Sequence, residues 1–506
     1  MKMMKNFSFV ATFLILMMIS FVNVDAKELN GSVSGLNLDE DTKLVGDVVL
    51  SKELFVASDK NITLDLNGHT ISVPSTVSGY GINNKGTLKI IDSSSNGGSI
   101  VCENSGSSCI ANSGKMEVRD VKVSSNDIAL KNEPTASLTV TNSNISSTYA
   151  KSDAGVIFNY GTLLIDNSSI IGTGKSTVAI MGMNADDNNV HTISKTTVKN
   201  STVSGRTAIS VPSGADDEVY VYDSSLNGGF EPRLTSKFEV HGKISTSKLS
   251  AKLLIGAVDD TVITLTKNSN FATVNSNPVD LKEGVVLKID DNVALNFKNA
   301  KINIKGIMRL GKGASVSVNS TGGINSAVYN KNQNVYYGSV ADATSEMVEG
   351  DVLKFNSADV VSSVNSSLYD VVLNDDGEYV VKYKDADYSK VNEAIAKAKK
   401  IDKNLYTSDS YNNLESAINK VITGKDITEQ NLVDSYASDI NEAIDNLVLV
   451  KKSTTNNNIV AKDSDVSNNI VNPQTYDGIE KWVILALTSL GGIILTIVYR
   501  KKIKAN

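Results

Sequence analysis

The chain has 506 residues, more than one ordinary hydrophobic core holds, and this length predicts two to four domains. It contains 49 Lys and Arg against 56 Asp and Glu; in 27–475, between two ends that we expect to be removed, there are 42 basic and 53 acidic residues. This acidic balance excludes attraction of nucleic acid or an anionic membrane by net charge. Val, Thr, Asn, Ser and Gly fill the first half, which favours many short strands joined by polar turns.

The first 26 residues have the pattern of a secretion signal. Lys2 and Lys5 provide a positively charged start, and residues 7–24 are almost entirely apolar. The tripeptide that ends at Ala26 then places small residues where a signal peptidase needs them. We therefore expect cleavage after Ala26; the alternative is an uncleaved membrane anchor.

From about residue 43 the chain repeats one phrase of alternating apolar and polar residues with an internal Asn-x-Gly or its relatives. The clearest copies are 82–92, 110–120 and 157–167, and looser ones centre on 138–142, 198–200 and 219–223. A polar residue closes each copy, at intervals of 28, 22, 25, 33 and 23 residues: Asp92, Asp120, Asn142, Asn167, Asn200 and Asp223. This irregular period with internal period-two alternation predicts a parallel β-helix over 27–230. An antiparallel sandwich, the competing fold, does not explain recurrence in one register.

Each copy is expected to form one coil whose inward residues stack on those of the next. The closing Asn and Asp residues are expected to stack at a turn, where their amides can bond along the axis. The uneven period predicts loops of different length on one side, notably 183–190. Asp186 and Asp187 are the densest acidic group in that loop, and such oxygen ligands favour Ca²⁺. The alternative there is a plain polar turn, and no other cofactor is expected.

Residues 62–71 (Ile-Thr-Leu-Asp-Leu-Asn-Gly-His-Thr-Ile) resemble the opening coil of pectate-lyase-like, right-handed β-helix domains of bacterial surface proteins. The resemblance implies right-handed coils but no activity, because a fold does not determine function. Lyases of this kind use Arg or Lys beside carboxylates that hold Ca²⁺, whereas Arg119 and Arg206 fall in different coils with no acidic cluster beside them. We therefore expect a protein that is not an enzyme. We interpret Asp65 and His69 as structural residues of the repeated motif and not as catalytic residues.

Cys102 and Cys109 are the only cysteines, and they flank a Gly-Ser turn. An exported chain permits a disulfide. A bridge over so short a loop would stabilise the fold by roughly 2–3 kcal/mol. The alternative is a pair of buried thiols.

Residues 231–385 keep the character of strands and are expected to be either more solenoid or a second β module. From residue 386 to 452 the apolar period changes to that of three amphipathic helices, which predicts a small bundle. The segments 387–391, 405–407 and 441–447 resemble the FIVAR module of Gram-positive surface proteins. That resemblance implies a spacer or, as in some relatives, contact with carbohydrate.

A polar linker, 453–471, leads to a three-part C-terminus. Asn472-Pro473-Gln474-Thr475 comes first, an apolar run at 482–499 long enough for a transmembrane helix follows, and a basic tail ends the chain. The arrangement over 472–506 resembles a sortase sorting signal. The resemblance implies cleavage after Thr475 and transfer to a cell-wall amine, with a sortase and peptidoglycan as partners.

Together these observations predict a mainly β protein, held at a bacterial cell surface in the wall or the membrane, with an extracellular N-terminal region. We expect an adhesin-like function in which the β-helix contacts glycans or a host or neighbouring surface, with no nucleic-acid partner. The alternatives are a polysaccharide lyase or glycoside hydrolase on the same scaffold, and a passive coat or spacer protein. The residues proposed as a sugar platform are Tyr80, Tyr160, Tyr220 and Tyr222.

Overall fold

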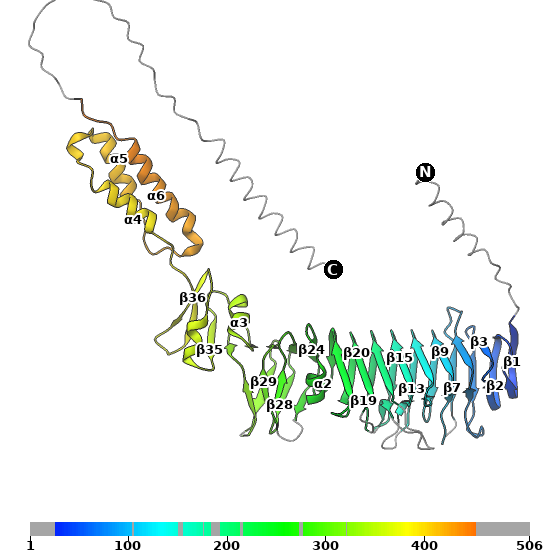
Figure 1. Cartoon of the computed structure of the whole chain (residues 1–506). Helices are drawn as coiled ribbons and strands as arrows, with labels where there is room; N and C mark the ends of the chain where they lie inside the picture. Colours follow the sequence, from blue (N-terminus) through cyan, green and yellow to red (C-terminus); the bar gives the residue numbers. More distant parts are fainter. Residues whose placement is uncertain are drawn as a thin grey trace, which may run out of the picture.

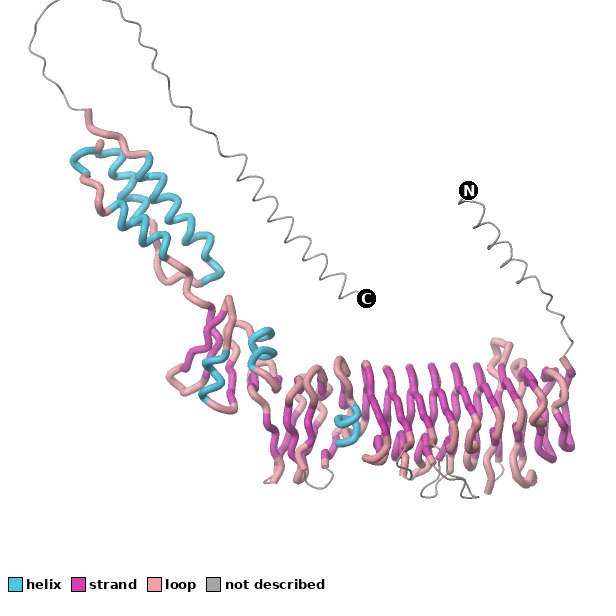
Figure 2. Tube along the Cα trace, viewed as in Figure 1, coloured by secondary structure: helices cyan, strands magenta, loops and turns pink. Residues whose placement is uncertain are grey.

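The structure is a computed structural model that describes residues 26–103, 106–149, 155–175, 177–183, 193–212, 216–272, 277–319 and 321–451. These residues are mainly β: a β-solenoid of about 11 turns is followed by a small antiparallel module and a helical bundle (Figures 1 and 2). Neighbouring coils pair in parallel, so the β-helix predicted from the repeat is confirmed and the sandwich is excluded.

The solenoid has three faces. Strands β1 (Lys27–Asn37) and β2 (Thr42–Val56) begin it, and β2 pairs with one strand on every face. The first face continues with β3 (Asn61–Asp65), β6 (Thr87–Ile91), β9 (Lys115–Arg119), β12 (Ser137–Thr141), β15 (Thr162–Asp166), β18 (Lys195–Lys199), β20 (Glu218–Tyr222) and β22 (Lys237–His241). The second face contains β4 (Thr70–Val73), β7 (Ser99–Cys102), β10 (Lys122–Ser125), β13 (Asn144–Ser147), β16 (Ser169–Gly172), β19 (Thr202–Ser210), β21 (Ser225–Glu231), β23 (Lys243–Thr246), β24 (Val262–Leu265), β27 (Val286–Ile289) and β30 (Ile307–Leu310). The third face contains β5 (Ile82–Asn84), β8 (Ile110–Asn112), β11 (Leu130–Asn132), β14 (Gly155–Asn159) and β17 (Val178–Gly182), continued by the ends of β19 and β21.

The solenoid continues past residue 230. Helix α2 (Ala251–Gly256) packs against it, and two three-stranded parallel sheets complete the last coils. Their strands are β25 (Ser269–Phe271), β28 (Ala294–Phe297) and β31 (Ser315–Val318) in one sheet, and β26 (Val279–Leu281), β29 (Lys301–Ile304) and β32 (Gly323–Asn325) in the other.

An antiparallel module follows the last coil, so the two alternatives for 231–385 each describe one part of that region. The module contains β33 (Val328–Asn330), β34 (Val335–Tyr337), α3 (Val340–Glu346), β35 (Val352–Phe355), the 3₁₀ helix η2 (Ala358–Ser363), β36 (Tyr369–Leu373) and β37 (Tyr379–Tyr383). It has a hydrophobic cluster of its own around Tyr337 and Val381.

The bundle consists of α4 (Ser389–Ala398), α5 (Ser408–Asn419) and α6 (Gln430–Asp445), with the 3₁₀ turns η3 (Lys403–Leu405) and η4 (Ile427–Glu429) between them. Val391, Leu414 and Ile440 meet in its core, one from each helix. Among the described residues, no helix is long and apolar enough to cross a membrane. The predicted span at 482–499 lies outside them, as do the linker and nearly all of the predicted signal peptide.

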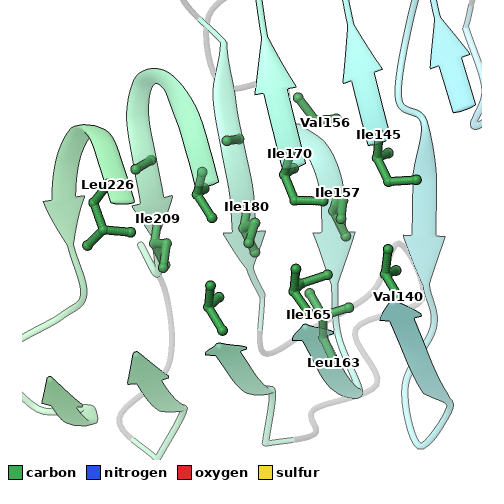
Figure 3. Close-up of a cluster of buried hydrophobic side chains, with 14 of the residues drawn as sticks. Val140, Ile145, Val156, Ile157, Leu163, Ile165, Ile170, Ile180, Ile209 and Leu226 are labelled. Atoms are coloured by element: carbon green, nitrogen blue, oxygen red, sulfur yellow. The ribbon is translucent and has the colours of Figure 1, made fainter. Parts of the chain in front are cut away.

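Apolar side chains fill the solenoid in stacked rows. Leu88 and Ile90 pair in register with Met116 and Val118 of the next coil, and all four are at most 2% exposed. One continuous cluster extends from Leu38 to Met308, and Figure 3 shows the part of it around Ile165 and Ile180. Burial of period-two apolar residues on every coil is the main force that holds the stack together.

Side-chain amides form a second row inside the solenoid. Asn84, Asn112, Asn132 and Asn159 occupy equivalent positions on the third face and are at most 1% exposed. Each Nδ2 donates to the Oδ1 of the next member at 2.8 Å, and Asn159 ends the row on Thr196. The Asn of the repeated phrase therefore satisfies buried polar groups from coil to coil.

The closing residues of the phrase do stack at a turn, but their main contribution is backbone conformation. Asp120, Asn142, Asn167, Asn200 and Asp223 all have φ between 43° and 60°, which Asn and Asp tolerate best after Gly. The expected amide bond along the axis is present between Asn167 Nδ2 and Asn142 Oδ1 at 2.6 Å.

Asp92 is the exception in this series. Its carboxylate accepts the backbone N–H groups of Gly68 and Gly98, at 2.7 and 2.5 Å, and thereby fixes the 92–98 loop. In this coil the longer loop 92–98 therefore takes the place of the tight turn found in the later coils.

Candidate ligand-binding face

Three consecutive strands near the middle of the solenoid place their outward side chains in a regular grid. In β18, β20 and β22, Lys195, Glu218 and Lys237 are in register. Thr197, Tyr220 and Glu239 form the next row, and Lys199, Tyr222 and His241 the last. Outward residues in a strand lie two positions apart, and adjacent strands are about 4.8 Å apart, so these side chains form one surface. We call these nine residues the lysine–tyrosine face.

Lysines surround the two tyrosine rings. The Nζ atoms of Lys195 and Lys237 lie 5.2 and 5.3 Å from the ring centre of Tyr220. Lys199 Nζ lies 5.3 Å from the ring centre of Tyr222. These distances are within the range of a cation–π interaction, so the cations hold the rings in place.

A stacked pair extends the aromatic surface. The rings of Tyr222 and His241 are 4.5 Å apart and inclined by 15°. His241 Nε2 lies 3.1 Å from Glu239 Oε2, a contact that orients the imidazole. The two rings therefore form one aromatic stack that bridges neighbouring coils.

Ion pairs and hydrogen bonds shift the pKa values of charged side chains on this face. Lys195 Nζ lies 3.0 Å from Glu218 Oε2; this contact raises the pKa of Lys195 and lowers the pKa of Glu218. A hydrogen bond with Tyr220 raises the pKa of Lys237. Lys195 and Lys237 are accordingly cationic at neutral pH, and the two glutamates are each paired with a cationic or imidazole neighbour.

A polar depression of about 320 Å³ adjoins the grid at the corner with the second face. Asn200 and Asp223, which directly follow Lys199 and Tyr222, form its wall with Lys243 and several serine and threonine side chains. Asp223 Oδ1 accepts the backbone N–H of Lys243 at 2.8 Å. Aromatic surface, cations and a hydroxyl-lined hollow thus lie side by side, an arrangement suited to a polar ligand with flat apolar patches.

The structure brings together only some of the tyrosines that the sequence suggested. Tyr220 and Tyr222 share this face, whereas Tyr80 precedes β5 and Tyr160 follows β14, beside the third face. Tyr160 is also buried, at 5% exposure. The sequence did not predict that three lysines lie beside these tyrosines. Period-two alternation marks the lysines as outward, but the register across the long coil before β18 was not known, so their neighbours could not be assigned.

The other site residues are placed as follows. Cys102 and Cys109 form a disulfide, with their Cα atoms 5.6 Å apart. Asp65 accepts the backbone N–H groups of Asn67 and Ser93, which gives it a role in the turn.

The remaining predicted sites cannot be compared in the same way. Asp186, Asp187 and the sorting signal 472–475 lie outside the described residues, and Ala26 is the first residue within them. Within the described ranges, no three His, Cys, Asp or Glu side chains are grouped so as to hold a metal ion.

Comparison with known proteins adds no relative. No protein-family model matches the chain, and neither a curated protein nor a solved structure matches it.

Proposed function

We propose that the protein is displayed on a bacterial cell surface and binds glycans through the lysine–tyrosine face. The observation that supports this proposal is the alignment of Tyr220, Tyr222 and His241 with three lysines on adjacent coils. The apolar faces of sugar rings pack on aromatic rings, and cations and hydroxyl groups bind the polar edges. A surface that extends over three adjacent coils suits an extended polymer such as a polysaccharide.

The finer features of the proposal rest on sequence resemblance. We propose a right-handed, pectate-lyase-like β-helix, a FIVAR module as spacer between solenoid and linker, and a sortase signal that anchors the chain to peptidoglycan. In this arrangement the bundle of α4, α5 and α6 separates the binding face from the wall.

The test is retention of the purified protein on plant, mucin and microbial polysaccharides, with and without Ca²⁺, while new chain ends are measured in the same samples. We expect saturable retention without cleavage. The double variant Tyr220→Ala/Tyr222→Ala should weaken retention about tenfold or more, equivalent to about 1.4 kcal/mol. Lys199→Ala should also weaken it, whereas Lys89→Ala, an exposed lysine on β6 of the same solenoid face, should not.

Other outcomes assign the rival functions. New chain ends would show a lyase or hydrolase on this scaffold. Neither retention nor cleavage, for any polysaccharide, would favour a passive coat or spacer. Retention that is unchanged in the double tyrosine variant would place binding elsewhere on the molecule.

A further inference from the structure

A groove of about 350 Å³ lies where the solenoid meets the antiparallel module, remote in sequence from the lysine–tyrosine face. The last coil contributes 324–326 to its lining. The hairpin of β33 and β34 contributes Tyr329, Lys331 and Tyr336, and the end of β35 contributes 354–356. This volume is near the lower end for small-molecule sites, which corresponds to a ligand of about one sugar residue.

The groove exists because the two sheets part at this point. Strand β30 ends the parallel ladder of the second face and pairs antiparallel with β34, which carries the sheet into the module. Strand β32, on the same last coil, pairs with β29 and, among the described strands, forms the edge of its sheet. The wedge between β32 and the module is therefore built by the change from parallel to antiparallel pairing.

Aromatic rings form one side of this wedge. Tyr329 is directly opposite Tyr336 across the hairpin, and their rings are stacked at 4.3 Å and 23°. Tyr336 packs against the end of the solenoid core, and burial raises its pKa. Phe355 lies on the opposite face of β35 from Lys354, where it packs edge-on against Tyr379 at 5.3 Å in the module's own cluster and supports the strand from behind. The rings are held on both sides, so the aromatic surface is preformed.

One cation in the groove has no counter-ion in the described part of the chain. Lys331 is paired with Glu378, whereas exposed Lys354, directly opposite Tyr329 on β35, has no ion pair with any described residue. Asn356, next to Phe355, donates its backbone N–H to Ala327 and leaves its side-chain amide without a hydrogen bond inside the described part of the protein. An unpaired cation and a free amide beside aromatic rings favour a ligand that has a flat apolar face and a carboxylate.

We propose that this groove binds an acidic sugar residue, such as a uronic acid or a sialic acid at a chain end. Its carboxylate pairs with Lys354, its ring packs on the tyrosine pair, and its hydroxyl groups bond to Asn356 and the open edge of β32. Charge-assisted hydrogen bonds to a carboxylate are roughly twice as strong as neutral ones, so the charge selects acidic over neutral sugars. The site is separate from the glycan-binding face proposed above and does not depend on it.

The test uses the full-length chain with glucuronate, galacturonate and N-acetylneuraminate, and with glucose and galactose as neutral counterparts, followed by saturation-transfer NMR. We expect saturable binding of at least one acidic sugar and about tenfold weaker binding of the neutral ones. Lys354→Ala should reduce the affinity for the acidic sugar about tenfold, and Tyr329→Ala should reduce it similarly.

Two controls separate this site from others. Lys382→Ala removes an exposed lysine on β37 of the same module and should leave binding unchanged. Tyr222→Ala, in the lysine–tyrosine face, should also leave it unchanged, so failure of the first proposal does not mimic failure of this one. Because Lys354 is exposed, its replacement should change the free energy of unfolding by no more than about 0.5 kcal/mol.

The proposal is overturned by any of three results: no acidic sugar binds, neutral sugars bind equally well, or Lys354→Ala leaves the affinity unchanged. Binding of a short acidic peptide with dependence on Lys354, without binding of any sugar, would overturn the assignment of the ligand to sugars.

Discussion

Buried amides inside the solenoid have no water to replace a lost partner. Each member of the row Asn84, Asn112, Asn132 and Asn159 donates to the next coil, and Asn112 Oδ1 also accepts the backbone N–H of Gly114 at 3.2 Å. An unsatisfied buried polar group costs about 1–3 kcal/mol. The row therefore fixes the register of successive coils as well as their stability, because a shift of one residue would break every amide bond in it.

Removal of one amide from this row should be costly. Asn112→Ala leaves the Nδ2 of Asn84, the Oδ1 of Asn132 and the N–H of Gly114 each short of a partner. We expect the free energy of unfolding to fall by about 2–4 kcal/mol, measured by urea denaturation. The matched control is Asn270→Ala, which removes an exposed amide contact between two coils and should change it by no more than about 0.5 kcal/mol. Equal effects for the two variants would contradict a structural role for the row.

Two buried aspartates should respond to pH with opposite signs. Burial raises the pKa of Asp217 above 3.8, outweighing the hydrogen bond from the Ser194 backbone, and its Oδ2 has no partner among the described residues. Burial also acts on Asp92, but the N–H groups of Gly98 and Gly68 and the Ser94 hydroxyl outweigh it and lower the pKa. Asp217 therefore opposes folding at neutral pH, whereas Asp92 supports it.

These pKa shifts determine whether each variant gains or loses stability. Asp217→Asn should raise the free energy of unfolding at pH 7 by about 1 kcal/mol, and this gain should vanish as the pH falls below 3.8, where both states of the wild type are protonated. Asp92→Asn should lower stability at pH 7, with a loss that shrinks as the pH falls below the same value. Thermal midpoints measured between pH 3 and 7 would check both; parallel pH profiles for the two variants would contradict the assignment.

The two ends of the solenoid differ in how their strand edges are covered. Strand β1 is the exposed edge, and it has two irregularities in register with β2 and two glycines, Gly31 and Gly35, at positive φ. Such irregularities distort an edge and oppose pairing with another chain. The other end is covered, because β34 pairs antiparallel with β30 and turns the sheet into the module.

The glycine of the repeated phrase marks a close approach between neighbouring coils. A Cβ on Gly114 would lie 2.1 Å from the carbonyl oxygen of Gly86 in the preceding coil. The backbone cannot yield without breaking the ladder, so Gly114→Ala should lower the free energy of unfolding by about 3 kcal/mol or prevent folding. Gly323→Ala is the matched control, since the nearest atom to its Cβ is Lys301 Cγ at 3.9 Å. Urea midpoints that shift equally for both variants would contradict this account.

In the order of the chain, the proposed ligand-binding surfaces lie on the solenoid and at its junction with the module, and the helical bundle comes between them and the C-terminal residues. This order suits a protein anchored at its C-terminus, because the helices and the linker then act as a spacer. The anchoring itself rests on the resemblance of 472–506 to a sorting signal.

Anchoring has a direct test. Thr475→Ala should shift the protein from the cell-wall fraction to the membrane fraction, because the peptide bond after Thr475 is the one that a sortase would cleave. Thr455→Ala, in the linker, changes the same residue type outside the signal and should leave the distribution unchanged. Immunoblots of wall and membrane fractions would show the difference, and undiminished wall linkage of the Thr475 variant would rule out the sortase mechanism.

Local sequence patterns predict the coil and its apolar interior. Period-two alternation is a local property that every coil repeats, so it predicted inward stacking of Leu88 and its equivalents in later copies. The buried amide row of Asn84 and its equivalents was not predicted, because stacking was expected at the closing Asn and Asp residues instead. The change of period after residue 386 likewise predicted helices, which pack as a bundle. The αL turn at Asn142 and its equivalents was visible as a position but not as a conformation.

Which outward side chains become neighbours follows from the register of the folded coils and not from any local pattern. Tyr220 meets Lys195 and Lys237 through the register between coils of unequal length, and that register depends on how much chain each loop consumes. The groove beside Tyr329 depends on where parallel pairing stops and the sheet turns antiparallel. Inward positions are dictated by burial, which the sequence pattern records; outward positions are free of that constraint, so their neighbours are set by the path of the whole chain.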